Sequence, residues 1–306
     1  MQRESNKRMP AYHFISGLPR AGSTLLSAIL LQNPRFHAGM TSPVGTLYSG
    51  MLQQFGAGTE FGPVITTDER KRLVRGLFDS YYANQTDKAV VFDTNRMWTA
   101  HLPMLMDQFP GSKVIACVRN VAWVMDSLER KYAGDPYEIT RLFNNDTERA
   151  TVYSRVETLA IPNRMVGYPW TALKSAFYSE HAASMLLIEY DLLAQAPHKV
   201  LPLIYQFIGE EPFAHDFERI AYDAPDFDAP LGMRGLHKVR PAVSLQARDT
   251  ILPPDLFAQY SKLSFWKDTA GSRANVLAVK ASDGAPKSPP LTGEASSKFP
   301  PLPGEG

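Results

Sequence analysis

A turn near the N-terminus carries residue types that bind an anion. An apolar run over residues 12–16 leads into the turn, and a stretch with helical periodicity follows it, so the turn should join a strand to a helix. Backbone N–H groups and the positive end of such a helix point at one place. Arg20 lies inside the turn, and Ser23 and Thr24 follow it. The pattern predicts a phosphate or sulfate site.

The same turn departs from the usual ATP-binding loop. Gly17 and Gly22 have the spacing of a Walker A loop, but Ser23 stands where that loop has lysine. The cation is Arg20 instead, whose planar guanidinium can bind phosphate through two N–H groups. This departure argues against a standard ATPase or GTPase. An ordinary turn with Ser23 or Thr24 as the helix cap is the alternative interpretation.

A second anion site is predicted after the apolar run over residues 113–118. Arg119 ends this run, and Ser127 lies eight residues further on. With Asn120 as a helix cap, two helical turns would bring Ser127 to the side that faces Arg119. An arginine that ends a strand is more often an ion-pair partner, so we predict this second site only because the chain also contains the first loop.

Four short apolar runs, each followed by helical periodicity, predict an α/β protein. They cover residues 12–16, 89–92, 113–118 and 185–190. Alternating strands and helices need crossover connections, so we expect a three-layer, P-loop-like fold with a central, mainly parallel sheet flanked by helices. Ligands of such sheets bind at the carboxyl ends of the strands, which is where Arg20 and Arg119 fall.

The chain is expected to form one domain over residues 1–270, followed by a tail over 271–306. The tail alternates proline with Gly, Ser and Lys, so it cannot bury enough apolar surface to offset its ordering entropy, and we expect it to be disordered. The Gly, Ser, Thr and Pro-rich segment 39–67 is a candidate acceptor loop or lid. Two helical stretches, 145–164 and 169–183, are expected to form a wall over the site.

Composition excludes several classes of protein. The net charge of +1 on 306 residues gives no overall field that would favour nucleic acid, so no nucleic-acid partner is expected. Cys117 is the one cysteine and lies in an apolar run, which excludes an internal disulfide and a zinc cluster. No stretch is apolar for long enough to span a membrane, and a cytoplasmic location is expected. The oligomeric state is not predicted.

The two anion-binding motifs resemble those of the sulfotransferases that use 3′-phosphoadenosine-5′-phosphosulfate (PAPS). The first loop, residues 17–24, is similar to the family's 5′-phosphosulfate loop, particularly the "GxPRSGTT" form of bacterial and tyrosylprotein-sulfotransferase-like members, with Ala21 where serine is frequent. Residues 113–127 resemble the 3′-phosphate motif. Weaker similarities lie at 188–193 and at the late basic segment 235–240. The resemblance runs in the family's order from Tyr12 to Tyr260.

This resemblance implies an enzyme that transfers a sulfuryl group from PAPS to a hydroxyl or amine of a small-molecule or peptide acceptor, without a metal. The residues implied to hold the nucleotide are Arg20, Ala21, Gly22, Ser23 and Thr24 at the 5′-phosphosulfate, Arg119 and Ser127 at the 3′-phosphate, Lys238 and Arg240 from the late segment, and Tyr190 near the adenine. For Lys238 and Arg240 the alternative is a pair of solvated loop charges, and for Tyr190 it is plain core.

The exit of the second strand supplies the candidate catalytic residues. Asp93 is the favoured general base, with a helix cap or an arginine partner as its alternative role. Thr94 stands where relatives tend to have lysine, and Arg96 is the candidate for the missing charge. His101 precedes Leu-Pro, which echoes the "THLP" of small-molecule sulfotransferases, whose histidine is the base. The loop over 37–43 lacks the carboxylate of tyrosylprotein enzymes, which argues against tyrosine-peptide sulfation.

Two other functions remain open at this point. An atypical small-molecule kinase would use Asp93 to hold magnesium, but it would also need a loop lysine that is absent. A non-catalytic nucleotide-binding scaffold could use the proline-rich tail for SH3-like partners. The pair Arg119 and Ser127 favours the sulfotransferase, because a 3′-phosphate clamp has no use in binding ATP.

Overall fold

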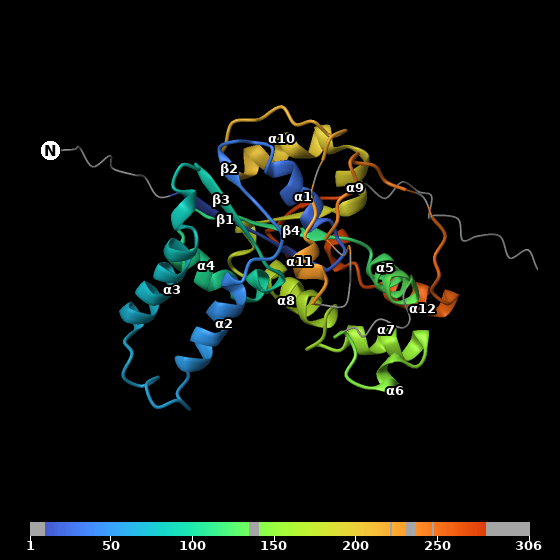
Figure 1. Cartoon of the computed structure of the whole chain (residues 1–306), viewed down its shortest axis with the longest axis horizontal. Coiled ribbons are helices and arrows are strands. Elements are labelled where there is room, and N and C mark those ends of the chain that lie inside the picture. The colour runs from blue at the N-terminus through green and yellow to red at the C-terminus, as the bar shows by residue number, and fades with distance from the viewer. Residues whose placement is uncertain are drawn as a thin grey trace, which may run out of the picture.

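The computed structural model describes residues 10–134, 141–220, 222–230, 235, 237–246 and 248–279. Within these residues the strands form one parallel sheet in the order β2-β3-β1-β4-β5-β6. The strands are β1 (Ala11–Gly17), β2 (Phe36–His37), β3 (Val90–Thr94), β4 (Val114–Val118), β5 (Met185–Glu189) and β6 (Asn275–Leu277). Figure 1 shows helices on both sides of the sheet, which confirms the predicted three-layer α/β fold.

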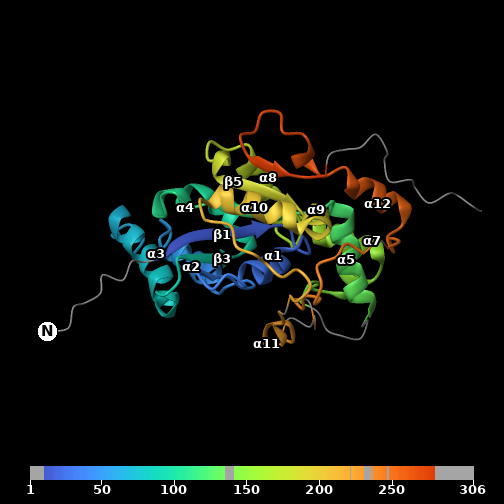
Figure 2. The ribbon, with the colours of Figure 1, turned by 90° about the horizontal axis from the view of Figure 1, so that it is seen from above.

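Helices lie between consecutive strands, because parallel strands need crossover connections. They are α1 (Ser23–Leu30), α2 (Val44–Gln54), α3 (Thr67–Tyr81), α4 (Leu102–Gln108), α5 (Val121–Gly134), α6 (Asp146–Arg149), α7 (Val152–Ala160), α8 (Gly167–Phe177), α9 (Tyr190–Gln195), α10 (Pro197–Ile208), α11 (Pro225–Asp228) and α12 (Pro254–Ser261), with short 3₁₀ turns η1 (Ala83–Gln85), η2 (Arg96–His101), η3 (Ala182–Ser184) and η4 (Phe265–Lys267). Helices α1 and α10 lie on one side of the sheet, and α3, α4 and α8 lie on the other (Figures 1 and 2).

The central strands are buried on both faces, as helices on both sides require. All residues of β3, β4 and β5 are buried, and so are all but the first of β1. Near-continuous apolar runs are typical of parallel strands with two covered faces. The register pairs Ile15 with Thr94 and Gly17 with Cys117. The carboxyl ends of the strands therefore meet at one edge of the sheet.

The two shortest strands, β2 and β6, were not predicted from the sequence. The four predicted strands each match a strand of the structure to within one or two residues, whereas β2 has two residues and β6 has three. Strand β6 pairs with β5 through Val276 and Leu187, although it lies in the segment that we expected to be disordered from residue 271. That expectation is wrong for β6, because Val276 and Leu277 are partly buried against the core. Residues 280–306 of the predicted tail lie outside the described residues.

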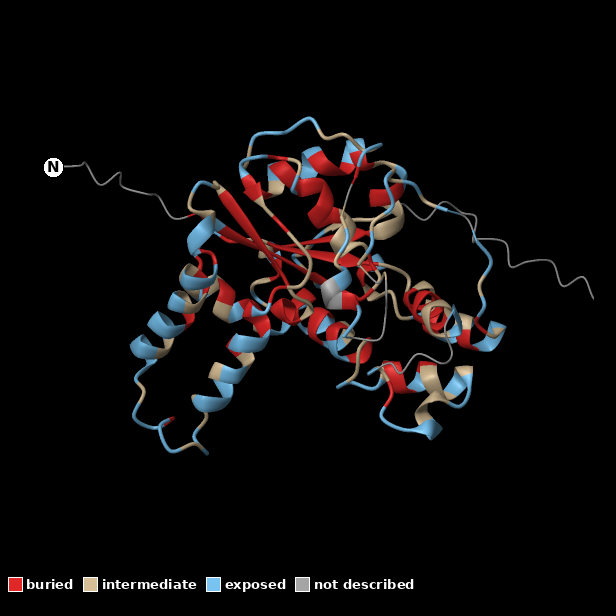
Figure 3. Ribbon diagram, viewed as in Figure 1, coloured by how far each residue is buried: buried red, intermediate tan, exposed pale blue. Residues whose placement is uncertain are grey.

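Two other segments differ from the prediction. The stretch predicted as one helix over 145–164 is broken into α6 and α7, because Thr151 caps α7 and accepts a hydrogen bond from the backbone N–H of Ser154. The predicted loop 39–67 contains helix α2. Helices α2 and α3 form an arm that projects from the body of the molecule (Figure 1), and the outer part of this arm is exposed (Figure 3).

Among the described helices, none is both long enough and apolar enough to cross a membrane.

Candidate functional site

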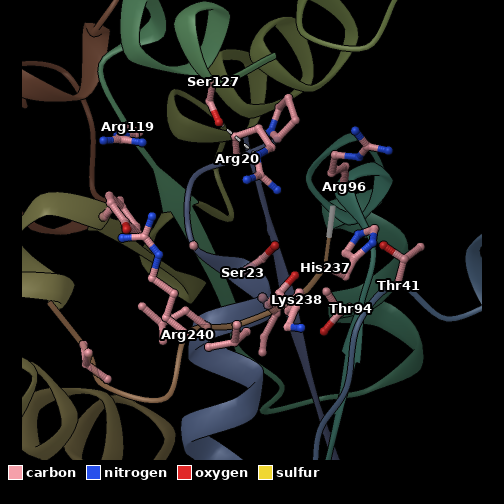
Figure 4. A pocket seen from close by; sticks show the side chains of 18 of the residues that line it. Arg20, Ser23, Thr41, Thr94, Arg96, Arg119, Ser127, His237, Lys238 and Arg240 are labelled. Atoms are coloured by element: carbon pink, nitrogen blue, oxygen red, sulfur yellow. Dashed lines mark hydrogen bonds between the residues drawn. The ribbon is translucent and has the colours of Figure 1, made fainter. Parts of the chain in front are cut away.

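A pocket of about 540 Å³ lies at the carboxyl ends of β1, β3 and β4. The predicted residues that line it are Arg20, Gly22, Ser23, Thr24, Arg96, Arg119, Ser127, Tyr190, Lys238 and Arg240. Figure 4 shows their arrangement: in this view Arg119 lies toward one end, Arg20 lies in the middle, and Arg96 lies toward the other end with Thr41 and His237. The structure does not bring three predicted residues, Ala21, Asp93 and His101, to this pocket. Ala21 is buried instead.

The loop between β1 and α1 is held in an unusual backbone conformation. Arg20 has φ 58° and Gly22 has φ 93°, so both residues are in the left-handed region. A side chain at Gly22 would place its Cβ 2.7 Å from Cδ2 of Tyr190, so only glycine fits. Gly22 is also the residue that precedes α1, which has no side-chain cap and no acidic residue in its first turn. Gly22, Ser23 and Thr24 line the pocket at this helix start, and the cap role considered for Ser23 and Thr24 is wrong.

Arg20 joins the two predicted anion sites. Its Nε donates to Oγ of Ser127 on α5 over 3.1 Å. Burial lowers the pKa of the Arg20 guanidinium, and repulsion from Arg119 and Arg248 lowers it further. A bound anion would relieve both effects, because it would stabilise the charged form.

Arg119 lies at the carboxyl end of β4 and is only partly paired. Its guanidinium stacks on the ring of Tyr190, with 4.4 Å between the two centres, and its Nε is 3.6 Å from Oδ1 of Asp191. Neither of these two buried atoms makes a hydrogen bond within the described structure. Ser127 bonds Arg20 rather than Arg119, so the predicted pair is connected through Arg20. A phosphate group fits here, because it would provide acceptors for Arg119.

A late cation, Arg248, was missed from the sequence and also lines the pocket. Its NH2 group lies 2.7 Å from Oδ2 of Asp126, a carboxylate on α5 that is completely buried. The same carboxylate accepts from the hydroxyl of Thr250 over 3.1 Å and from the backbone N–H of Ile251 over 2.8 Å. Asp126 thus fixes residues 248–251 against α5. The residues next to Arg248 in the sequence contain no pattern that predicts this contact.

Asp93, the favoured base, lies in the core instead. Its carboxylate is completely buried and accepts three hydrogen bonds of 2.7 Å, from the hydroxyls of Ser42 and Tyr82 and from Nε1 of Trp98. Burial raises the pKa of Asp93, and these three bonds oppose the rise. Through Ser42, Asp93 anchors the start of α2. The geometry assigns Asp93 a structural role, which corrects the sequence-based prediction.

The other two candidate catalytic residues separate in the structure. Arg96 is the first residue of η2. Asn95 precedes it and accepts a hydrogen bond from the backbone N–H of Met97. The Arg96 side chain lines the pocket. Burial lowers the pKa of Arg96. His101 faces away: its ring packs edge-on against Tyr48 with 5.0 Å between centres. Burial also lowers the pKa of His101. Arg96 therefore lines the pocket and His101 does not.

A histidine that sequence reasoning passed over lines the pocket. His237 lies in the late segment, and its ring is paired with Asp228 at the end of α11. The segment is held by an antiparallel pair of backbone hydrogen bonds, from Val239 to the carbonyl of Tyr222 and from Ile220 to the carbonyl of Pro241. Only the basic residues of this segment were singled out from the sequence, because no motif marks the histidine.

No group of three or more His, Cys, Asp and Glu side chains that could hold a metal ion occurs among the described residues.

The fold and the pocket define an α/β protein with an arginine-containing loop at the carboxyl edge of a parallel sheet. The chain belongs to the sulfotransferase family, whose family model matches residues 13–215, more than half of its length. The resemblance seen in the two motifs is thereby confirmed.

Solved structures of sulfotransferases are similar to this chain at low identity. The sulfotransferase domain of the Synechococcus PCC 7002 olefin synthase is 16% identical, with a TM-score of 0.45, and the match covers 86% of this chain and 97% of that domain. A sulfotransferase from Alicyclobacillus acidocaldarius is 18% identical, with a TM-score of 0.45, over 73% of this chain and 90% of its own. No curated protein sequence matches the chain.

Proposed function

We propose that this protein transfers a sulfuryl group from PAPS to a hydroxyl or amine acceptor, by in-line displacement and without a metal. The observation that supports the proposal is the hydrogen bond between Arg20 and Ser127, because the loop after β1 and helix α5 thereby line the same pocket. A nucleotide with phosphates at both ends requires two such anion sites. The adenosine of PAPS connects them.

The residues have distinct roles in this proposal. Arg20 and the N–H groups that begin α1 bind the 5′-phosphosulfate, together with the hydroxyls of Ser23 and Thr24. Arg119 and Ser127 bind the 3′-phosphate, and positive charge is added by Lys238 and Arg240 from the late segment and by Arg248 beyond it. Tyr190 supports Arg119 by stacking on it, a contact different from the adenine contact that the resemblance implies.

Arg96 is the group we assign to the sulfuryl oxygens. None of the ion pairs in the described chain includes Arg96, although the residue is mostly shielded from solvent and lines the pocket. Negative charge on the equatorial oxygens and on the leaving phosphate must be stabilised during transfer, and a fixed guanidinium does this without reorganisation. PAPS supplies the leaving group, adenosine 3′,5′-bisphosphate.

Calorimetric titration with adenosine 3′,5′-bisphosphate tests the donor class, with ATP plus magnesium as the comparison. We expect the bisphosphate to bind and ATP not to bind. Binding of ATP alone would contradict the proposal and support the kinase, whose magnesium ligand would need to be Asp93. That carboxylate already accepts three hydrogen bonds in the core.

The assignment of Arg119 to the 3′-phosphate is tested by a difference between two ligands. Arg119→Ala should weaken binding of adenosine 3′,5′-bisphosphate by about 2–3 kcal/mol, roughly thirty- to hundredfold, because an arginine–phosphate contact in a partly dry site is charge-assisted. Binding of AMP, which has no 3′-phosphate, should change much less. Equal losses of affinity for both ligands would contradict the assignment of Arg119 to the 3′-phosphate.

A second experiment distinguishes an enzyme from a nucleotide-binding scaffold. The purified protein is incubated with ³⁵S-labelled PAPS and a panel of phenols and alcohols, with and without EDTA. Labelled product in both samples supports metal-independent transfer. Bisphosphate binding with no transfer to any acceptor, water included, would support the scaffold.

A further inference from the structure

His237 and Asp228 form a closely held pair at the pocket. Nδ1 of His237 lies 2.5 Å from Oδ1 of Asp228, and the backbone N–H of His237 donates to Oδ2 over 2.9 Å. The Asp228 side chain is 1% exposed and the His237 side chain is 15% exposed. One buried carboxylate therefore holds both the backbone and the ring of His237. The low exposure of Asp228 and its two contacts with His237 distinguish this pair from an ion pair on the surface.

The pair determines which ring nitrogen can take a proton. A carboxylate accepts hydrogen bonds, so this pairing favours the His237 tautomer that has the proton on Nδ1, toward Asp228, and the lone pair on Nε2. The same arrangement orients the histidine of serine hydrolases and stabilises the imidazolium that forms there. In Figure 4 the His237 ring lies on the Arg96 side of the pocket, away from Arg119. That is the side assigned to the sulfuryl group.

The other titratable side chains of the described pocket lining suit this role poorly. They are Arg20, Arg96, Arg119, Arg141, Tyr190, Lys238, Arg240 and Arg248. Arginine and lysine keep their protons at neutral pH, the ring of Tyr190 is stacked against Arg119, and no carboxylate lines the described part of the pocket. Imidazole both accepts and releases protons near neutral pH.

We infer that His237 is the general base for the acceptor and that Asp228 is its positioning residue. This inference rests on the proposed sulfuryl transfer and adds the proton path to it. The acceptor O–H gives its proton to Nε2 of His237, and the acceptor oxygen forms a bond to sulfur. The bond from sulfur to the 5′-phosphate oxygen breaks, and its electron pair leaves with adenosine 3′,5′-bisphosphate. Asp228 balances the imidazolium until the proton passes to solvent.

His237→Ala tests the base. With ³⁵S-labelled PAPS and a panel of substituted phenols, kcat should fall by about a hundredfold or more, which is the usual contribution of a general base. Calorimetric affinity for adenosine 3′,5′-bisphosphate should change less than about threefold. Added imidazole should restore part of the rate, because it can occupy the space of the missing ring. The loss should be smallest for p-nitrophenol, which ionises most readily and needs a base least.

Two further variants separate catalysis from folding. His181→Ala removes another histidine with an acidic neighbour, Glu180 at 3.7 Å, but lies outside the pocket, so its kcat should equal that of the wild type. Asp228→Asn keeps the shape of the carboxylate without its charge. It should lower kcat about tenfold or more with KM nearly unchanged, and imidazole should not rescue it, because His237 still occupies the site.

The outcomes separate the inference from the function on which it rests. Failure of the wild-type protein to bind the bisphosphate would overturn the proposed function itself. Binding with normal transfer by His237→Ala would leave that function intact and overturn the base assignment. A loss in His237→Ala that imidazole does not relieve would also overturn it and assign the pair to holding the late segment. Release of labelled sulfate to water is measured in parallel, so the test does not depend on which phenols are chosen.

Discussion

Nε of Arg20 donates to Oγ of Ser127 over 3.1 Å, which joins the loop after β1 to helix α5. The two residues are 107 positions apart in the chain, yet each was predicted to hold a different phosphate of one ligand. Because of this bond, a substitution at either residue should affect both predicted anion sites.

Ser127→Ala should weaken binding of adenosine 3′,5′-bisphosphate by about 1 kcal/mol, or roughly fivefold, because Arg20 loses its hydrogen bond to Ser127 and the ligand loses a donor. Isothermal titration calorimetry measures this change. Ser27→Ala is a matched control, since it removes a buried hydroxyl on α1 that bonds Thr94 but does not line the pocket. Its affinity should equal that of the wild type. Equal affinity in both variants would argue against a ligand contact at Ser127.

Gly22→Ala should prevent nucleotide binding and lower the melting temperature. The new Cβ would lie 2.7 Å from the Tyr190 ring, at a residue with φ 93°. Gly111→Ala separates backbone strain from this collision, because Gly111 has φ 84° and nothing within 4 Å of the added atom. We expect the control to lose about 1–2 kcal/mol of folding stability and Gly22→Ala to lose more, as measured by thermal unfolding. Similar losses in both variants would show that the Tyr190 contact adds nothing.

Asp93→Ala should cost about 3–5 kcal/mol of stability, because it leaves Ser42, Tyr82 and Trp98 without their common acceptor in the core. Chemical denaturation measures the loss. A general base would behave in the opposite way: a hundredfold lower kcat at an unchanged free energy of unfolding would restore the catalytic role that Asp93 was first given.

Arg96→Met should lower kcat about a hundredfold while leaving the melting temperature of the free protein unchanged or higher. A shielded guanidinium outside any ion pair of the described chain opposes folding, and Met removes that charge with similar bulk. Transfer assays and thermal unfolding on the same sample test both parts. A large drop in melting temperature would show that Arg96 has a structural role instead.

His13 predicts a pH dependence of stability. Burial, together with the charge of Lys113, lowers the pKa of His13 from 6.5 to about 4. Above pH 6.5 the ring is neutral in both states; between pH 6.5 and 4 the unfolded chain binds a proton that the native chain does not, so stability falls as the pH falls. Over that range His13 should remove up to about 3 kcal/mol.

The matched variant is His13→Asn, whose Oδ1 can accept the hydrogen bond that the backbone N–H of Lys113 donates to Nδ1 of His13 over 3.0 Å. Denaturant titrations at pH 7 and pH 4.5 should show a smaller decrease for the variant than for the wild type. Identical decreases would assign the pH dependence to other groups.

Features that depend on near neighbours in the chain were predictable. Four strands followed from apolar runs, and the turn with Arg20 followed from its glycines and hydroxyls. Arg119 and Ser127 were predicted at the carboxyl edge because a strand that passes into a helix must end there. These patterns depend on backbone preferences and periodicity within a few residues, which a single sequence displays.

Other features required the folded chain. The sequence does not show whether the Asp93 carboxylate faces the pocket or the core; in the folded chain Ser42, Tyr82 and Trp98 meet it in the core. The pairing of Asp126 with Arg248 joins residues that are far apart in the chain, and β6 forms only because β5 offers it an edge.

The sequence by itself determined the α/β architecture, the glycine-bounded loop with Arg20 and the position of Arg119 at the edge of the sheet, since the local pattern encodes these. Only the tertiary structure decided which titratable groups meet the pocket, removing Asp93 and His101 and adding His237 beside Asp228. The physical reason is that the chemistry of a side chain depends on its burial and partners, and long-range packing sets both.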